Sequence, residues 1–125
     1  MIVKPGSAIV AGVGPERGLG AALALCFAAK GLHVFIVGRS SEKLNAVVQA
    51  VQANGGEATA VVADVTAAQD VAHCFGVVRE RGDNVQVAAY NVDSNISAPF
   101  LQTDEKTFTA LWRQNCLGAF LFAKE

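Results

Sequence analysis

Val13-Gly14-Pro15-Glu16-Arg17-Gly18-Leu19-Gly20 connects two apolar segments of different periodicity. Residues 7–13 form a short apolar run bracketed by Pro5-Gly6 and Gly14-Pro15, which favours a buried strand over a helix fragment. A helix is expected over residues 18–30, because Gly31 supplies a stop and side chains recur at helical spacing at Leu19, Leu23, Cys26, Phe27 and Lys30. The glycines therefore lie in a turn from the first strand into the first helix.

The rest of the chain repeats this alternation of strand and helix. Strands are predicted at 33–37, 58–63 and 85–90, and the last of these leads into a loop at 91–102. Local capping and stop signals mark the remaining helices: Ser40 or Ser41 and Asn54-Gly55-Gly56 for the second, a Thr66/Gln69 capping box and Gly82 for the third, and Thr103 before Asp104 for the last.

The predicted strands are apolar on both sides, which is typical of a parallel sheet covered by helices on both faces. Right-handed crossovers then produce an α/β, Rossmann-like, doubly wound sheet of four strands in the order 3-2-1-4. The chain shows no internal repeat or linker, so residues 1–125 are interpreted as one domain.

Composition excludes several classes of protein. Of the 125 residues, 52% are hydrophobic and 17% charged, unlike a disordered chain, and a net charge of −1 gives no reason to expect nucleic acid or an anionic membrane as partner. The longest apolar helix-like run, residues 19–29, is too short to span a bilayer. Cys26, Cys74 and Cys116 form neither a disulfide framework nor a zinc site, so we expect no metal and a reducing, cytoplasmic location.

The glycine-rich turn is suited to binding phosphate. A helix N-terminus offers free N–H groups and a positive dipole, and absent side chains let a pyrophosphate approach the backbone. The alternative is a tight turn that binds nothing. The Gly-x-Gly-x-x-Gly pattern begun at Gly12 fails at Arg17, and no glycine precedes a lysine as a Walker-type loop requires.

Arg39 follows the second strand, where a dinucleotide site meets the adenosine ribose. An acid there binds the 2′-hydroxyl of NAD, whereas an arginine accommodates the 2′-phosphate of NADP. Arg17 could reach the same phosphate from the turn. The sequence therefore predicts a preference for NADP(H), with NAD(H) possible, unless both arginines are only solvated surface residues.

These features, taken in order, resemble the short-chain dehydrogenases/reductases. The resemblance covers nearly the whole chain and adds Asp64-Val65, Tyr90-Asn91-Val92-Asp93 and the segment 112–120 to the glycine turn. It implies cofactor contacts from Gly14, Arg17, Gly18, Leu19, Gly20, Arg39, Asp64, Val65 and Asn91.

Asn115 matches the active-site Asn of that family. Its helical stripe, Phe108, Leu111, Trp112, Asn115, Ala119 and Phe122, predicts that the amide points from the buried face. A catalytic and a purely structural role remain open. The chain departs from the family at Asp93, where a glycine is usual, at Tyr90 for the first Asn, and at Val13 for a Thr.

The family's catalytic Ser and Tyr-x-x-x-Lys pair are absent from this sequence, whose single tyrosine, Tyr90, is followed four residues later by Ser94. The resemblance thus implies the cofactor-binding part of an oxidoreductase that acts on alcohols or carbonyls by hydride transfer, inactive alone. A fragment, a truncated reading frame and a non-catalytic relic all fit.

Two other functions remain open: a regulatory NAD(P)-binding module, and an assembly domain that has lost its ligand because of Asp93. The fourth strand would be a sheet edge and the last helix is apolar on more than one side, so we expect a homo-oligomer formed through one of them.

Overall fold

A computed structural model describes residues 6–94 and 96–125 of the chain. Its centre is a parallel sheet in the order β3-β2-β1-β4, which confirms the predicted topology. The strands are β1 (Ser7–Ala11), β2 (His33–Gly38), β3 (Ala58–Val62) and β4 (Val85–Tyr90). Pro5, expected to help open the first strand, and Asn95, in the expected loop, lie outside the described residues.

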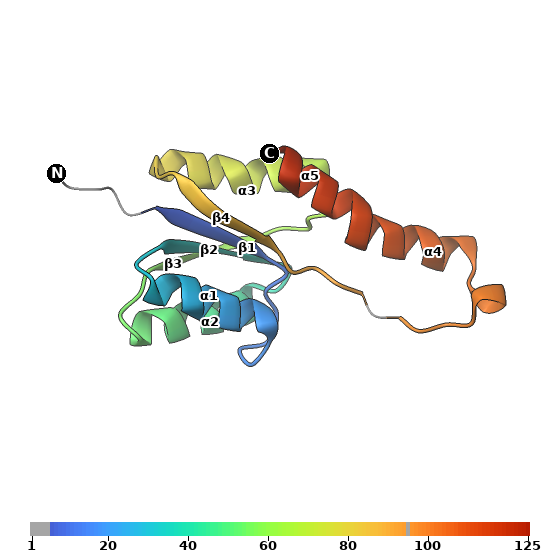
Figure 1. Ribbon diagram of the computed structural model, residues 1–125, viewed down its shortest axis with the longest axis horizontal. Coiled ribbons are helices and arrows are strands. Elements are labelled where there is room, and N and C mark those ends of the chain that lie inside the picture. Colours follow the sequence, from blue (N-terminus) through green and yellow to red (C-terminus); the bar gives the residue numbers. More distant parts are fainter. Residues whose placement is uncertain (1–5, 95) are drawn as a thin grey trace.

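Helices cover both faces of the sheet, as Figure 1 shows. One face carries α1 (Leu19–Ala29) and α2 (Ser41–Ala53), and the other carries α3 (Ala68–Arg81) and α5 (Gly118–Lys124). Between β4 and α5 the chain runs outward through a short 3₁₀ turn (Phe100–Gln102) and returns along α4 (Glu105–Trp112) and a π-turn (Arg113–Leu117). We call residues 96–112 the arm.

The core consists of two apolar clusters, one on each face of the sheet. Alternate residues of β1 serve opposite clusters, since successive side chains of a strand point to opposite faces. Ile9 packs toward α3 and α5, in the cluster that contains Phe75 and Phe122. Val10 packs toward α1 and α2, in the cluster that contains Ala24 and Leu44. Helices on both faces thus explain why the strands are apolar on both sides.

The predicted first helix is present as α1, and its buried face consists of small residues. Gly20, Ala21, Ala24 and Ala28 are its buried residues, whereas Leu19 is 66% exposed. Small side chains let the helix lie close against the sheet, and the larger Leu23, Leu25 and Phe27 pack against the same cluster while only partly buried. Of the residues that recur at helical spacing in the sequence, Leu23 and Phe27 are partly buried against the core, whereas Leu19, Cys26 and Lys30 are exposed.

Several caps follow the prediction and two do not. Ser40 Oγ accepts from Lys43 N at 3.4 Å at the start of α2, and Gly82 ends α3 in the left-handed region. The Thr66/Gln69 capping box is wrong: α3 begins after Ala67, and the Thr66 hydroxyl donates to Asp64 Oδ1 at 2.7 Å.

The prediction that Thr103 caps the last helix is also wrong. The N-cap of α4 is Asp104, whose Oδ1 accepts from Thr107 N at 2.8 Å. The Thr103 hydroxyl donates instead to the Pro99 carbonyl at 3.1 Å. A carboxylate at the cap also carries a negative charge to the positive end of the helix, which explains the one-residue shift.

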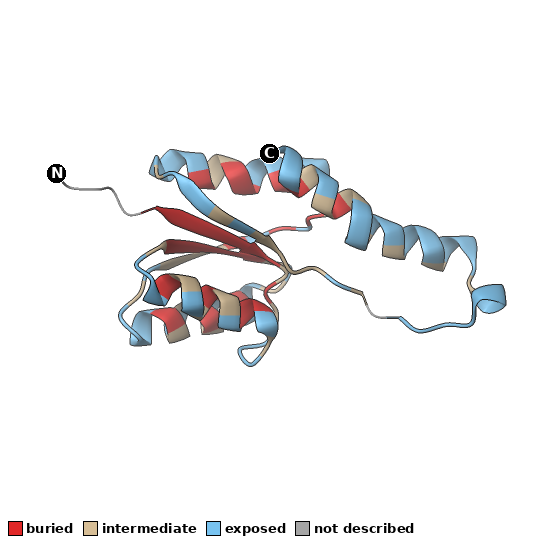
Figure 2. Ribbon diagram, in the orientation of Figure 1, coloured by how far each residue is buried: buried red, intermediate tan, exposed pale blue. Residues whose placement is uncertain are grey.

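Figure 2 shows the difference in burial between the body of the fold and the arm. The helix α4 has no buried residue, and Asn115 is exposed, so the expectation that its amide points from a buried face was wrong. Gly118 and Phe122 are the buried residues that hold the C-terminal segment on the sheet. In the part of the chain that the structure describes, no helix is both long and apolar enough to cross a bilayer.

Candidate functional site

A cleft of about 410 Å³ opens at the carboxyl ends of the strands, where ligands bind in open α/β sheets. Segments that follow all four strands contribute to its wall, and α4 and the π-turn complete it. The lining residues are Gly12, Val13, Gly14, Gly38, Arg39, Ala63, Asp64, Val65, Thr66, Asn91, Val92, Asp93, Ala110, Arg113 and Gln114.

Two glycines let the β1–α1 turn press against the end of β4. Gly12 has φ +86°, and a Cβ built there would lie 2.3 Å from the Asn91 carbonyl oxygen. A Cβ on Gly20 would lie 2.8 Å from the Gly12 carbonyl oxygen. Asn91 completes the contact, because its Nδ2 donates to the Gly12 carbonyl at 3.2 Å and its backbone N–H to the Ala11 carbonyl at 2.9 Å.

Gly14 differs from these two because packing does not require its lack of a side chain. A Cβ built at Gly14 would meet nothing within 4 Å, although the residue lines the cleft. The neighbouring helix α1 begins after Gly18 without a side-chain cap and has no acidic residue in its first turn. Open space beside uncapped N–H groups is the arrangement in which a phosphate can lie against the backbone.

The ends of β2 and β3 bring a cation and an anion to the cleft. Thr66 donates to Asp64 Oδ1 from both its hydroxyl, at 2.7 Å, and its N–H, at 2.9 Å. These bonds, and more weakly the Arg39 charge, hold the pKa of the Asp64 carboxyl below its usual range. Among the described residues, the exposed Arg39 guanidinium makes no ion pair within 4.0 Å, so it is available to a ligand.

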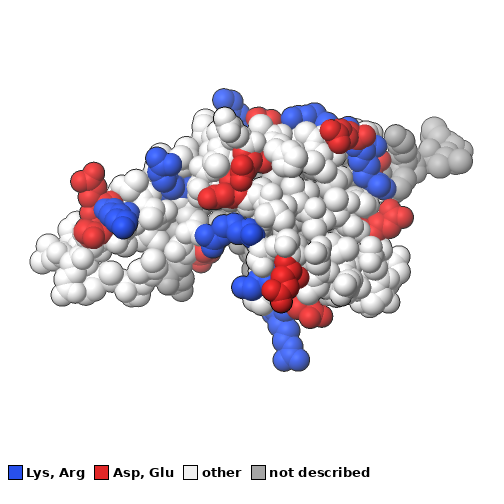
Figure 3. Space-filling view, turned by 180° about the vertical axis from the view of Figure 1, so that it is seen from behind, with Lys and Arg blue, Asp and Glu red and all other residues white. Residues whose placement is uncertain are grey.

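The face of the molecule drawn in Figure 3 carries no block of charge of one sign. On the face drawn in Figure 3, basic and acidic side chains are interspersed. Selection of an anionic ligand therefore depends on individual groups such as Arg39 rather than on a general positive field.

The structure brings some of the predicted site residues together and leaves others apart. Gly14, Arg39, Asp64, Val65 and Asn91 line the cleft. Outside its lining lie the residues that begin the first helix, together with the active-site candidate: Arg17, Gly18, Leu19, Gly20 and Asn115.

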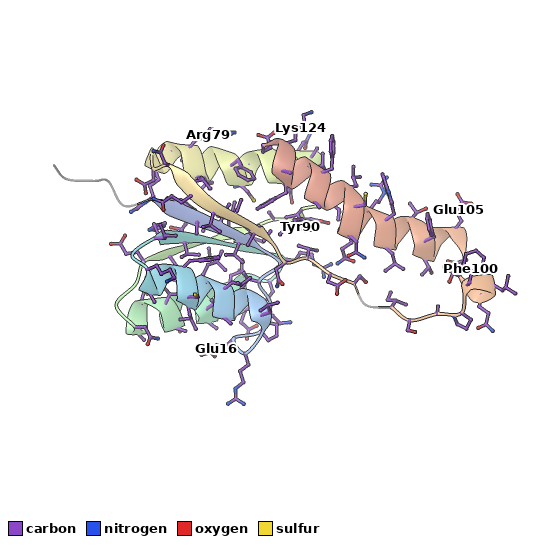
Figure 4. The ribbon with its side chains drawn as sticks, viewed as in Figure 1. Glu16, Arg79, Tyr90, Phe100, Glu105 and Lys124 are labelled. Carbon is purple, nitrogen blue, oxygen red and sulfur yellow. The ribbon has the colours of Figure 1, made fainter. Side chains whose placement is uncertain are left out.

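Two of the predicted residues outside the lining have a definite position. The exposed Arg17 follows Glu16, which Figure 4 labels in the turn before α1. Asn115 Oδ1 accepts from Ser94 N at 3.3 Å, so its amide braces the segment after β4.

Sequence reasoning missed the part of the wall that comes from the last helices. Ala110, Arg113 and Gln114 line the cleft, whereas the apolar stripe pointed to residues one position away on the helix. The π-turn changes the helical register after Trp112, and no propensity signal marks such a turn. Thr66 was named as a helix cap, Val92 only as part of a motif, and Asp93 as a departure that could disturb cofactor binding; all three line the cleft.

Tyr90 is the single tyrosine of the chain and its hydroxyl is already bonded. It donates to the Gln114 carbonyl at 2.5 Å. Burial, and to a smaller extent the charge of Asp64, raises the pKa of this phenol. The Tyr90 hydroxyl is thus held within the fold by the Gln114 carbonyl.

Comparison with known proteins agrees with this geometry. The family model described as short chain dehydrogenase matches residues 8–125. The 3-oxoacyl-(acyl-carrier-protein) reductase of Synechocystis sp. is 33% identical over 112 residues, which make up 89% of this chain and 45% of that protein. The chain thus spans about half the length of the curated relatives it matches.

Solved structures have the same fold. A short-chain dehydrogenase from Rhodopseudomonas palustris has a TM-score of 0.88 at 28% identity, covering 98% of this chain and 56% of that one. An actinorhodin polyketide ketoreductase mutant with NADPH has a TM-score of 0.89 at 23% identity, covering 96% of this chain and 45% of that one. At that identity the second likeness concerns the fold alone.

Proposed function

The chain belongs to the short-chain dehydrogenase family, and we propose that it is the NADP(H)-binding part of an oxidoreductase that transfers hydride between cofactor and an alcohol or carbonyl substrate. The observation that carries this proposal is the cleft at the carboxyl end of the sheet, with open space at Gly14 and a free guanidinium at Arg39. A pyrophosphate would lie in the open space at Gly14, and a 2′-phosphate would contact the Arg39 guanidinium.

Different residues would contact different parts of the cofactor. The turn at Gly14 and the first N–H groups of α1, from Leu19 and Gly20, receive the pyrophosphate. Asp64 and Val65 lie at the adenine, and Arg39 takes the ribose phosphate. Arg17 lies outside the cleft lining, so it contributes less than Arg39 to binding of the ribose phosphate. The preference for NADP(H) rests on Arg39.

This chain alone would bind the cofactor without turnover. Hydride transfer in the family requires a free acid beside the nicotinamide, and the Tyr90 hydroxyl is bonded to the Gln114 carbonyl. Residues 1–125 then act as one cofactor-binding domain that lacks the catalytic groups. The exposed apolar side chains of the arm and the free edge of β4 would associate with a second copy.

Titration of the purified chain with NADPH and with NADH tests the cofactor assignment. We expect NADPH to bind at least about tenfold more tightly, which one charge-assisted contact to the 2′-phosphate can supply. Arg39→Ala should remove most of this preference, whereas the control Arg17→Ala should change it by about twofold or less. Tighter binding of NADH, or no loss in Arg39→Ala, would contradict the preference.

The second candidate function is an assembly domain that has lost its ligand, and it remains because Asp93 lines the cleft. A carboxylate there repels the phosphates of the cofactor and occupies space that a glycine would leave open. Under this alternative the chain binds neither dinucleotide, and Asp93→Gly restores binding. Under the proposed function the unaltered chain binds NADPH, and Asp93→Gly changes its Kd only modestly. NADPH binding by the unaltered chain and by Asp93→Gly therefore distinguishes the two candidate functions.

A further inference from the structure

The π-turn between α4 and α5 leaves one backbone carbonyl without its helical donor. In an α-helix the N–H of Gly118 would donate to the carbonyl of Gln114, four residues earlier. Here it donates to the carbonyl of Arg113, five residues earlier. The Gln114 carbonyl is therefore free to accept a bond from outside the helix.

Tyr90 supplies that bond from the last position of β4. Its hydroxyl donates to the Gln114 carbonyl at 2.5 Å. Its ring packs against Phe122, with centroids 5.7 Å apart. Figure 4 labels Tyr90 between the sheet and the C-terminal helices, where the strand and the π-turn meet.

Gly118 is the residue that makes room for this hydroxyl. A Cβ built on Gly118 would lie 2.2 Å from the Tyr90 hydroxyl oxygen and 3.2 Å from the Val65 carbonyl oxygen. The buried glycine thus allows the phenol to reach past the helix to the Gln114 carbonyl. We call the set Tyr90, Gln114 and Gly118 the latch.

The latch lies next to the cleft wall. Arg113 and Gln114 line the cleft together with Ala110, and Val65, beside Gly118, lines it too. Were the turn to relax into an α-helix, the residues before it would rotate by about 100° relative to those after it. Arg113 and Gln114 would then leave their present positions on the wall.

We propose that Tyr90 is a positioning residue, whose hydroxyl stabilises the π-turn and thereby keeps Arg113 and Gln114 on the wall of the cofactor cleft. The proposal deepens the cofactor-binding function and rests on it. A purely structural hydroxyl would instead stabilise the fold without affecting cofactor affinity.

Tyr90→Phe is the direct test, because it removes the hydroxyl and keeps the ring on Phe122. We expect NADPH binding to weaken about tenfold, as for loss of a well-placed hydrogen bond that orders a binding wall. The control is Thr103→Val, which also removes a hydroxyl bonded to a backbone carbonyl but lies outside the cleft lining. Its Kd for NADPH should stay within about twofold of the unaltered chain.

NMR measurements test the latch in the absence of the cofactor. In Tyr90→Phe, the ¹³C′ chemical shift of Gln114 should move and the Gly118 amide should change its hydrogen exchange, because Gly118 N–H switches to the Gln114 carbonyl. Gly118→Ala should be destabilising in the unaltered chain and less so in Tyr90→Phe, where the hydroxyl that its methyl group meets is absent.

The outcomes separate the two proposals. If the unaltered chain binds neither NADPH nor NADH, the proposed function fails and the positioning role fails with it, while the NMR signals still report whether the latch forms. If NADPH binds and Tyr90→Phe leaves its Kd unchanged, the positioning role alone is refuted. Unchanged Gln114 and Gly118 signals in Tyr90→Phe would refute the latch itself.

Discussion

Two neighbouring strands of the same sheet have opposite environments. All five residues of β1 are buried, whereas β4, which pairs with β1 in parallel, has no buried residue. β1 has strands on both sides, and β4 ends the described sheet. Position within the sheet, rather than hydrophobicity, separates them, since Val85 and Val87 of β4 are as apolar as Val10 of β1.

The helices repeat this contrast. α1 and α2 each bury several side chains against the sheet, and α4 buries none. At the tip of the arm Phe100 is 91% exposed and Leu101 94% exposed. A large apolar surface of this kind is uncommon on a monomer and is typical of an interface. The contrast shows that the β1–β2 side is a packed core, whereas the β4–α4 side is exposed among the described residues.

The largest expected effect comes from truncating equivalent apolar residues on the two strands. Ile9→Ala should lower the free energy of unfolding by about 3 kcal/mol, because Ile9 is fully buried and its removal leaves a cavity. Val85→Ala, on the exposed strand, should cost about 0.5 kcal/mol or less. Urea unfolding of both variants measures the difference, and similar costs would show that β4 is buried in solution.

Cysteine reactivity compares the core with the surface. Burial, helped by the charge of Asp70, raises the pKa of the Cys74 thiol to about 11, whereas Cys26 and Cys116 are exposed. At pH 8 we expect two thiols to react quickly with Ellman's reagent and one about a hundredfold more slowly. Cys74→Ala should abolish the slow phase, and all three thiols should react quickly in urea. Three fast thiols in the native chain would contradict the burial of Cys74.

Polar substitution at the tip of the arm tests what covers the exposed side. Phe100→Ser with Leu101→Ser should weaken self-association about tenfold, by removing apolar contact area. It should change the free energy of unfolding of the monomer by no more than about 0.5 kcal/mol. Val62→Ser, at an exposed apolar residue of β3, is the control. Sedimentation equilibrium measures the association, and a stable monomer of the unaltered chain would disprove the second-copy contact.

The smallest expected effect concerns the carboxylate in the cleft. The Asp64 pKa is below its usual range in the folded chain, so its contribution to stability is present above the unfolded pKa and is lost as the pH falls through the folded value. Thr66→Val should raise this pKa more than Arg39→Ala, because the Thr66 hydroxyl bond is the largest cause and the Arg39 charge the smallest. A carboxyl-carbon NMR titration measures both, and the reverse order would contradict the assignment.

Local sequence signals predicted most of the fold but less of the site. The glycine turn, the strands and Gly82 as a helix stop lie where the patterns placed them, because each depends on neighbouring residues. The pattern was wrong for Asn115, which it placed on a buried face although the residue is exposed. That error arose from treating the apolar stripe of the last helix as its buried face.

The sequence by itself determined the order of elements, the parallel 3-2-1-4 sheet and the turn suited to phosphate, because periodicity, turn residues and right-handed crossovers are local or follow a general rule. Only the tertiary structure decided which residues line the cleft. The fit of Gly12 against Asn91 and the bond from Tyr90 to Gln114 join positions far apart in the chain, and the π-turn changes the helical register between them. Such contacts depend on how whole elements pack, which no short stretch of sequence encodes.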